Sequence, residues 1–473
     1  MQLAELTGKR IAILGAGREG QATHAWLRAR MPHAELTIFA EAPAETAFAQ
    51  GLQLHDTQSR DTQSRDTQSW DTQSRDTQSR DALIIEPFTS SRLLAFDVLV
   101  RSPGISPYRE ALQAAFAAGV RCTTPSSLWF AAHPDARTIC VTGTKGKSTT
   151  SALLAHLLRF NGHTVTLAGN IGLPLLACDD QGVDWWVIEL SSYQIADLEA
   201  SPTLSVILNL SPEHLDWHGS EEAYFRDKLR LARLTAGGRV IANAADAALA
   251  ARLADAGGLT WFETATGVHT VGQQLFYQGQ ALPVSMPKSM PGRHNLLNAA
   301  AALTAVLAAG SDLHHAALGV SSFISLPHRL QLLGERDGIS FVNDSIATTP
   351  VAVVAALEAL QDESVILLVG GFDRGLDWAP YLAAFHRAVP KAVISLPGNG
   401  PRIIETMRRG QLAPPSGFHD APDLNTAIAL ARHLACAGDT VLLSPGAPSF
   451  PQFSDFRDRG QTFARLCGFE CEK

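Results

Sequence analysis

The run from Thr138 to Thr150 constrains the fold of this chain more than any other stretch. Its first five residues, Thr-Ile-Cys-Val-Thr, are typical of a buried strand, and residues from Ser148 to Arg159 predict a helix. Glycines at positions 143 and 146 let the intervening backbone curl with its N–H groups pointing inward, as a phosphate requires. The sequence therefore predicts an αβ unit with a phosphate-binding turn.

The residues at the start of this helix favour a nucleotide. Lys147 can reach terminal phosphates, the Ser148 and Thr149 hydroxyls suit Mg²⁺, and a helix N-terminus attracts anions. The spacing of the glycines is shorter than in the usual G-x-x-x-x-G-K-[ST] pattern. The alternative is a helix start that carries Gly and Ser/Thr only for capping.

A second glycine-rich turn lies near the N-terminus. Strand-like residues 10–14 run into Gly15, Gly17 and Gly20, and a helix is expected from Gln21 to about Arg30. This context gives room for a diphosphate. The next strand, 36–39, is followed by Ala40-Glu41, so the acidic partner of an NAD ribose is shifted or missing. A dinucleotide-dependent oxidoreductase and a turn without any ligand remain alternatives.

Charged residues follow the ends of two further predicted strands. Glu189 ends the run Trp185-Trp186-Val187-Ile188, and Glu213, His214 and Asp216 come after the strand 204–209. Ligands bind at the carboxyl ends of parallel strands, so both placements favour function. Lys228 lies on a helix expected over 221–234, where an ordinary exposed lysine is the alternative.

Composition excludes several classes of protein. The net charge of -8 and pI near 6.0 argue against nucleic-acid and anionic-membrane binders. The six cysteines are scattered without metal-ligand spacing, and no apolar run is long enough to span a bilayer. We expect a cytoplasmic protein with no membrane insertion. Residues 56–80 repeat Asp-Thr-Gln-Ser-Arg, with Trp70 in place of one Arg, and predict a mobile insertion without a chemical role.

The αβ alternation predicts three domains with mostly parallel sheets and helices on both faces. We place them at 1–125, 126–325 and 326–473. Functional sites are then expected in the clefts between them.

Several motifs follow one another in order along the chain. They are Gly143-Thr144-Lys145-Gly146-Lys147-Ser148-Thr149, Gly169-Asn170-Ile171-Gly172, Glu189-Leu190-Ser191-Ser192-Tyr193-Gln194, Arg293-His294-Asn295, Leu326-Pro327-His328-Arg329, Asn343-Asp344-Ser345, and the C-terminal stretch with Ser444, Phe453, Phe456, Arg459 and Gly460. With these motifs the chain resembles the Mur ligases, and in particular their glutamate-adding, MurD-type members. The resemblance covers the whole chain except the repeat.

The resemblance implies an ATP-dependent ligase of peptidoglycan precursor synthesis, with Mg²⁺. Such enzymes phosphorylate the carboxylate of a UDP-linked muramoyl substrate to an acyl phosphate, which the amine of an amino acid then attacks. The implied catalytic residues are Lys147, Glu189, His214 and Lys228, of which Ser148, Glu189, His214 and a carbamylated Lys228 hold the metal. The implied ATP contacts are Gly143, Thr144, Lys145, Gly146, Lys147, Ser148, Thr149, Asn295, Asn298, Arg329 and Asp344. The implied UDP-substrate contacts are Gly15, Gly17, Arg18, Glu19, Gly20, Ser102, Asn170 and Ser191.

Two positions depart from the ordinary glutamate-adding pattern. Ile346 stands where a lysine helps to bind D-glutamate, and Arg374 stands where the family has a second lysine. Thr348, Ser449 and Phe456 remain as implied glutamate contacts. Since Arg offers a bidentate fork and Lys a point charge, the two changes rearrange the pocket. The pattern resembles a variant that adds L-glutamate, and D-glutamate is the alternative.

Other readings stay open for single residues and for the whole chain. Asn295 and Asn298 are also compatible with helix caps, His328 and Arg329 with a surface pair, and Asp344 with a turn. A folylpolyglutamate-type ligase or a non-catalytic P-loop protein would share the ATP core. We expect a monomer whose partners are small molecules, with no nucleic acid among them.

Overall fold

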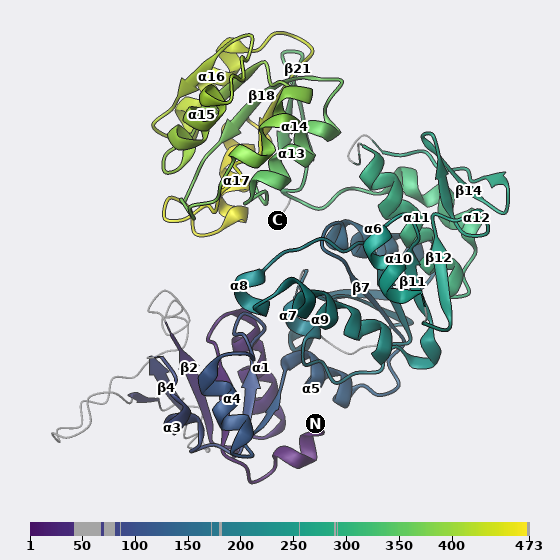
Figure 1. Ribbon diagram of the computed structural model, residues 1–473, viewed down its shortest axis with the longest axis vertical. Coiled ribbons are helices and arrows are strands. Elements are labelled where there is room, and N and C mark those ends of the chain that lie inside the picture. Colours follow the sequence, from purple (N-terminus) through teal and green to yellow (C-terminus); the bar gives the residue numbers. More distant parts are fainter. Residues whose placement is uncertain are drawn as a thin grey trace. The chain divides into compact units, whose positions relative to one another are not determined.

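The computed structural model describes residues 1–41, 68–70, 81–85, 87–171, 173–178, 182–254, 256–287, 290 and 292–470. Over these residues the chain forms two compact units (Figure 1). Unit 1 comprises Met1–Leu282 and Asn298–Ala317, and unit 2 comprises Pro283–Leu297 and Leu318–Lys473.

The first sheet of unit 1 has the strand order β3-β4-β2-β1-β5-β6. All neighbours are parallel except β3 and β4. Its strands are β1 (Ile11–Leu14), β2 (Leu36–Ala40), β3 (Gln68–Trp70), β4 (Asp81–Ile85), β5 (Val98–Arg101) and β6 (Arg121–Thr123), and its helices are η1 (Leu3–Leu6), α1 (Arg18–Arg30), α3 (Ser90–Leu93), α4 (Glu110–Ala117) and α5 (Pro125–Ala132).

Helices cover both faces of this sheet. Ile11 and Ile13 pack in one core with Trp26 and Leu27 of α1. Ala12 and Leu14, which point to the other face, pack with Leu112 and Ala115 of α4. This arrangement is the reason that β1 is apolar at every position.

The second sheet of unit 1 is parallel throughout, in the order β12-β11-β10-β7-β9-β8. Its strands are β7 (Thr138–Thr142), β8 (Val165–Gly169), β9 (Trp185–Glu189), β10 (Leu204–Ile207), β11 (Val240–Asn243) and β12 (Leu259–Phe262), and its helices are α6 (Lys147–Phe160), η3 (Leu175–Ala177), α7 (Ser192–Ile195), α8 (Leu215–His218), α9 (Glu221–Leu234), η4 (Ala236–Gly238) and α10 (Ala247–Leu253).

The two six-stranded sheets of unit 1 share one hydrophobic core. The cluster that contains Ile11 and Leu27 continues through Trp129 of α5 to Trp186 and Ile188 of β9. The rings of Trp129 and Trp186 lie 4.7 Å apart between centroids. The first sheet is therefore packed onto the second and is not merely tethered to it.

A small antiparallel sheet and two helices follow in the chain. The sheet is formed by β13 (His269–Val271), β14 (Gln274–Tyr277) and β15 (Gln280–Ala281). The helical elements after it are α11 (Arg293–Ala308), α12 (Leu313–Gly319) and η5 (Val320–Ser322).

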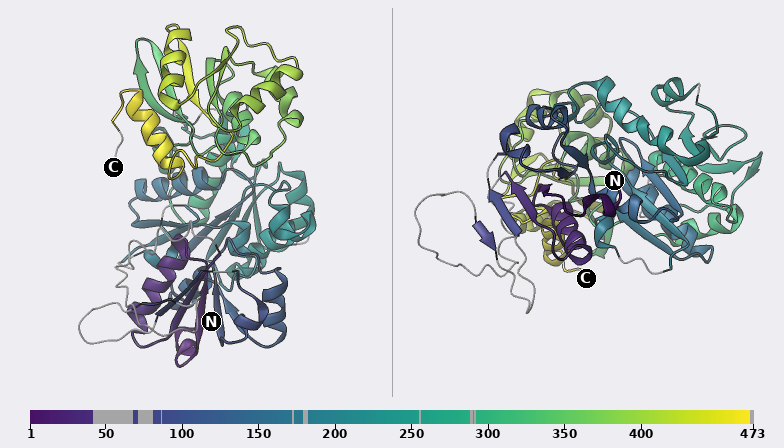
Figure 2. Two further views of the ribbon diagram at one scale, coloured as in Figure 1. Left: turned by 90° about the vertical axis from the view of Figure 1, so that its left-hand side faces the viewer. Right: turned by 90° about the horizontal axis from the view of Figure 1, so that it is seen from below.

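The sheet of unit 2 has the order β16-β17-β21-β18-β19-β20 and is parallel except for its edge pair β16 and β17. Its two faces carry separate cores, and the C-terminal helix α17 packs on one of them (Figure 2). The strands are β16 (Gln331–Arg336), β17 (Ile339–Asn343), β18 (Ser364–Val369), β19 (Ala392–Ser395), β20 (Phe418–Asp420) and β21 (Asp439–Leu443), and the helices are α13 (Pro350–Ala359), η6 (Ala379–Tyr381), α14 (Leu382–Arg387), α15 (Gly400–Arg409), α16 (Leu424–Leu434) and α17 (Phe456–Leu466).

The predicted fold class is confirmed: three mostly parallel sheets carry helices on both faces. The small antiparallel sheet was not predicted. The repeat 56–80 lies outside the described residues except for 68–70, which form β3, so its predicted mobility stays a prediction. Within the described ranges, no helix is both long and apolar enough to cross a membrane.

Candidate functional site

The turn between β7 and α6 has the curled backbone that its glycines predicted. Gly146 is the N-cap of α6 and adopts a left-handed conformation, with φ of 82°. A Cβ at this position would lie 2.4 Å from Oδ1 of Asn298, so only glycine fits. The Lys147 amine donates to the carbonyl oxygens of Gly143 and Thr144, both at 3.0 Å.

Strand β10 lies next to β7 in the sheet, and the loop after β10 closes the other side of the turn. The Lys145 N–H donates to Oδ1 of Asn209 at 2.8 Å, and the Lys145 amine forms an ion pair with Glu213 at 2.6 Å. The Thr144 hydroxyl contacts the hydroxyl of Tyr224 at 2.9 Å. Side chains of the loop after β10 and of α9 therefore hold the phosphate turn in shape.

Lys228 lies buried at this turn, so the alternative of an ordinary exposed lysine is wrong. Only 2% of the residue is exposed, and its amine donates to the Gly143 carbonyl oxygen at 3.0 Å. Burial, and then the nearby charge of Lys147, lowers the pKa of Lys228 well below its ordinary value. The amine is thus biased toward its neutral, nucleophilic form.

Glu189 ends β9 as a buried carboxylate with unused hydrogen-bonding capacity. One oxygen accepts a hydrogen bond from the Asn170 side chain at 2.7 Å. The other, Oε2, is buried and has no hydrogen-bond partner among the described residues. A buried carboxylate oxygen needs a cation or a donor, so this atom is suited to a metal ligand.

His214 precedes the short helix α8 and is held in a left-handed conformation, with φ of 57°. Its ring lies 4.9 Å from the ring of Tyr193. Burial lowers the pKa of His214. The nearby Glu213 raises this pKa, and the positive charges of Lys147 and Lys228 lower it further. The ring is therefore mostly neutral at pH 7 and retains a nitrogen that can accept.

Two observations suit the predicted metal site, although its residues are not a conventional cluster of acidic, histidine and cysteine side chains. Among the described residues, no group of three or more His, Cys, Asp and Glu side chains is arranged to hold a metal ion. The predicted set instead combines Glu189 and His214 with a serine hydroxyl and a modified lysine. The unpaired Oε2 of Glu189 and the buried amine of Lys228 are the two observations that suit it.

The first-domain residues predicted to bind the UDP substrate gather at the end of β1. A Cβ on Gly20 would lie 1.9 Å from the Gly15 carbonyl oxygen, and one on Gly15 would lie 3.0 Å from the Ser102 side chain. The Ser102 hydroxyl is buried and unpaired within the part of the chain that is described. Burial raises the pKa of Glu19 to about 7. Gly17 caps α1, and Arg18 is exposed in its first turn.

Asn170 and Ser191 already have protein partners. Asn170 bonds Glu189, as described above. The Ser191 hydroxyl accepts from the Gln194 N–H at 3.3 Å and caps α7. Their substrate contacts stay a prediction.

The predicted ATP contacts divide between the units. Ser148 and Thr149 lie half-buried in the first turn of α6, and Asn298, on α11, accepts from the Thr150 hydroxyl at 3.2 Å. Asn295, Arg329 and Asp344 belong to unit 2.

In unit 2 the turn after β17 is built from side chains. Asp344 is buried and accepts from the Ser444 hydroxyl at 2.8 Å and from the Leu330 N–H at 3.2 Å. Burial raises its pKa to about 7, so Asp344 is more than a simple turn residue. His328 is buried, with Nδ1 3.0 Å from the Asn343 amide nitrogen, which makes the surface-pair alternative wrong for this histidine.

The predicted glutamate contacts differ in their exposure. Ser449 is buried, Thr348 and Phe456 are half-buried, and Arg374 is exposed. Arg459, which was not assigned a role, is buried and donates to the hydroxyl and carbonyl oxygens of Ser345 at 3.0 and 2.8 Å.

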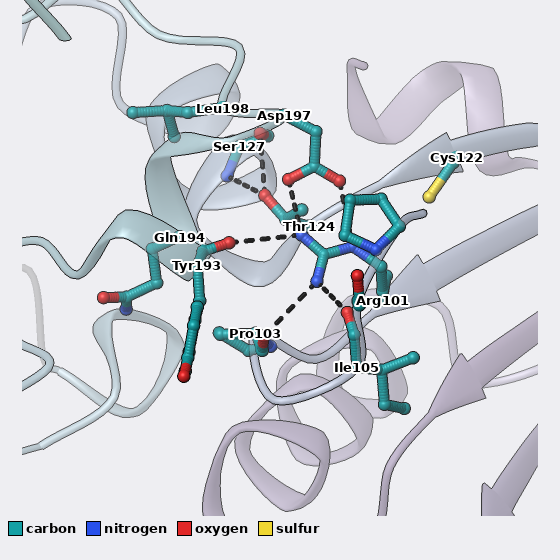
Figure 3. A network of polar contacts seen from close by, with 12 residues as sticks. Arg101, Pro103, Ile105, Cys122, Thr124, Ser127, Tyr193, Gln194, Asp197 and Leu198 are labelled. Carbon is teal, nitrogen blue, oxygen red and sulfur yellow. Dashed lines mark hydrogen bonds and ion pairs between the residues drawn. The ribbon is translucent and has the colours of Figure 1, made fainter. Parts of the chain in front are cut away.

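The sequence analysis also missed Arg101, His218 and Asp227. Arg101 is fully buried between the first two sheets, where it forms an ion pair with Asp197 at 2.6 Å (Figure 3). A charge that ends the apolar run Val98-Leu99-Val100 was the signal available, as it was for Glu189.

Comparisons with known proteins agree with this architecture. The family description "Mur ligase middle domain" matches residues 141–306, and "Mur ligase, glutamate ligase domain" matches residues 328–446.

Curated relatives match over the full length. A protein of Xylella fastidiosa (strain Temecula1) named UDP-N-acetylmuramoyl-L-alanine--L-glutamate ligase is 43% identical over 487 residues, which cover 100% of this chain and 98% of the relative. Proteins with the same name from Xanthomonas axonopodis pv. citri and from a Micromonospora strain are 44% and 37% identical, over 99% and 98% of this chain and 97% of each relative.

Solved structures share the fold at low identity. The UDP-N-acetylmuramate-alanine ligase MurC of Thermotoga maritima matches with a TM-score of 0.58 and 17% identity, over 97% of this chain and 99% of that one. The MurF ligase of Thermotoga maritima, solved with ADP, matches with a TM-score of 0.56 and 17% identity, over 79% of this chain and 95% of that one.

Proposed function

Since the chain belongs to the Mur ligase family, we propose that it joins L-glutamate to UDP-N-acetylmuramoyl-L-alanine in a reaction driven by ATP. The observation that carries the proposal is the buried Lys228 amine on the Gly143 carbonyl oxygen, beside Lys147. It supports a phosphoryl-transfer site, because burying an amine against a phosphate turn costs desolvation that an apolar side chain at the same place on α9 would not.

A carboxylate is a poor electrophile, so the alanine carboxylate of the substrate first takes the γ-phosphoryl group of ATP. The amine of glutamate then attacks the acyl phosphate, and phosphate leaves. Lys147 is the cation placed to neutralise the transferred phosphoryl group, and the first turn of α6 supplies N–H donors. Gly143, Thr144, Lys145, Gly146, Ser148, Thr149, Asn295, Asn298, Arg329 and Asp344 complete the proposed ATP contacts.

The neutral Lys228 amine is suited to attack CO₂, forming a carbamate and releasing a proton. The product carries a negative charge where the amine had none, and it becomes an oxygen ligand. We assign Ser148, Glu189, His214 and the carbamylated Lys228 to Mg²⁺, which when bound offsets the charge of the phosphate oxygens.

The UDP end of the substrate is assigned to Gly15, Gly17, Arg18, Glu19, Gly20 and Ser102, with Asn170 and Ser191 nearer the reacting carboxylate. Thr348, Arg374, Ser449 and Phe456 are assigned to glutamate. The three domains are assigned to 1–125, 126–325 and 326–473, in a monomeric cytoplasmic enzyme.

The proposed preference for L-glutamate rests on Ile346 and on the full-length relatives named for that substrate. The test is release of ADP with UDP-N-acetylmuramoyl-L-alanine and either enantiomer of glutamate, with product mass measured. Activity with L-glutamate alone is expected. Activity with D-glutamate alone would replace the substrate assignment, and no ADP with either would remove the ligase proposal.

A further inference from the structure

One loop of unit 1, which connects β5 to α4, makes hydrogen bonds with segments that belong to the second sheet and its helices. It begins with Arg101 at the end of β5 and runs to Tyr108, and we call residues 101–108 the bridging loop. Figure 3 shows the Arg101 guanidinium between the bridging loop on one side and Tyr193 and Asp197 on the other.

All three nitrogen atoms of this guanidinium donate hydrogen bonds. Nε and Nη2 donate to the Asp197 carboxylate at 2.9 and 2.6 Å, and Nη2 also donates to the Tyr193 carbonyl oxygen at 3.3 Å. Nη1 donates to the carbonyl oxygens of Ser102, Pro103 and Ile105. A bidentate, fully buried arginine fixes both of the segments that it joins.

The middle of the bridging loop holds Trp217, the third residue of α8. The Trp217 indole N–H donates to the Gly104 carbonyl oxygen at 3.3 Å, and the Ser106 hydroxyl donates to the Trp217 carbonyl oxygen at 2.8 Å. The indole also stacks on the ring of Tyr193 at 4.5 Å.

The end of the loop reaches the last residue of α8 through a carboxylate. The Tyr108 hydroxyl donates to Oδ2 of Asp227 at 2.6 Å, and Nδ1 of His218 lies 2.8 Å from the same oxygen. The other ring nitrogen of His218 lies 2.9 Å from the Ser192 hydroxyl. His218 and Asp227 are each 3% exposed.

These contacts surround the two residues that the reaction uses. His214 caps α8 and therefore moves with Trp217 and His218, and Lys228 directly follows Asp227 on α9. The other end of the same system is Ser102, which lies in the bridging loop with a buried hydroxyl that has no partner in the described ranges.

We propose that His218 and Tyr108 are positioning residues, which act through Asp227 to set His214 from the loop assigned to the UDP substrate. The inference rests on the proposed function and deepens it. It assigns no contact with substrate to either residue.

The test is a double-mutant cycle on turnover. Tyr108→Phe removes one hydroxyl and leaves the ring packing, and it should lower kcat about fivefold to tenfold, as expected for a lost hydrogen bond to a carboxylate. His218→Gln should lower kcat further. The KM values for ATP and for the UDP substrate should change less than about twofold, because Arg101 and the glycine turns remain.

The decisive measurement is the same substitution in a His214→Ala background. If Tyr108 acts by placing His214, Tyr108→Phe should then change kcat less than about twofold. Tyr381→Phe, on η6 of unit 2, is the matched control and should leave kcat unchanged in both backgrounds.

A purely structural Tyr108 would lower the melting temperature and leave kcat intact, or would lower kcat by the same factor in both backgrounds. Either outcome overturns the inference while the wild-type enzyme stays active. A wild-type protein that makes no ADP from its substrates would instead overturn the proposed function, and this inference with it.

Discussion

The turns after β7 and after β17 both follow an inner strand of a six-stranded sheet but are built in opposite ways. Each leads from the carboxyl end of a strand inside a six-stranded sheet toward a helix. The first turn is shaped by backbone, with Gly146 in a left-handed conformation. The second is shaped by side chains, since Asn343, Asp344 and Ser345 each make a hydrogen bond.

The two turns also differ in the sign of the ionisable group buried beside them. The first turn holds a lysine whose pKa burial lowers, and the second holds an aspartate whose pKa burial raises to about 7. Both groups are thus driven toward neutrality. The glycine-built turn leads directly into α6, whose first N–H groups have no carbonyl partner within the helix, whereas α13 begins only at Pro350, which has no N–H. We therefore expect the first turn to receive most of a ligand's negative charge, and the side-chain hydrogen bonds of the second turn to hold Asp344 in place.

The largest expected effect removes the buried lysine. Lys228→Ala should lower turnover at least about 1,000-fold, as expected when a charge-stabilising group is lost from a phosphoryl-transfer site. Added acetate or another short carboxylate should restore part of the activity by standing in for the carbamate. ADP release measures both, and Lys9→Ala, an exposed lysine, is the control. Full activity of the unsupplemented variant would break the comparison.

The next effect concerns the pH dependence of stability at the second turn. Because the folded-state pKa of Asp344 is raised, the folded protein retains a proton that the unfolded chain releases above about pH 4. The stability of the wild type should therefore fall relative to Asp344→Asn as pH rises from 4 to 7, by up to about 1.4 kcal/mol per pH unit. Denaturant titrations at several pH values measure the difference. A difference that does not vary with pH would show that Asp344 is ionised normally.

A smaller effect separates the two ways of building a turn. Gly146→Ala should destabilise unit 1 by about 1–3 kcal/mol, because alanine is strained at this φ and its Cβ meets Asn298. Gly375→Ala, also at positive φ but with open space around it, is the matched control that isolates backbone strain. Thermal unfolding measures both. Equal losses would mean that the contact with Asn298 adds nothing.

The smallest effect tests the exposed arginine of unit 2. Arg374→Ala should raise the KM for glutamate about tenfold and leave the KM for ATP unchanged, since one charged hydrogen-bonding group is lost. Arg387→Ala, an exposed arginine of α14, is the control. Steady-state kinetics with each substrate varied decides the matter, and an unchanged KM for glutamate would remove Arg374 from the amino-acid site.

The sequence predicted the helices and strands whose pattern of apolar residues is long and regular. Buried parallel strands such as β9 and β18 are continuous apolar runs, and α9 was predicted with its observed bounds, Glu221–Leu234. The strands β13–β15 were not recognised, because they are two to four residues long and mostly polar or exposed.

The candidate site likewise has parts that the local sequence predicts and parts that depend on tertiary packing. Glycine and lysine spacing marked the phosphate turn, because its geometry is local. The burial of Lys228 depends on how α9 packs against β7 and its turn, and the pairing of His218 with Ser192 and Asp227 joins three separate segments. No local pattern records such contacts, so the exposed-lysine alternative could not be dismissed from the sequence.

The buried Arg101 has a practical consequence for dissecting the molecule. A fragment that stopped after the first sheet would lose Asp197 and the Tyr193 carbonyl group, so the guanidinium that holds the bridging loop would keep only its contacts within that loop. Ligand titrations that test the proposed UDP-substrate contacts should therefore use a polypeptide that includes both six-stranded sheets of unit 1.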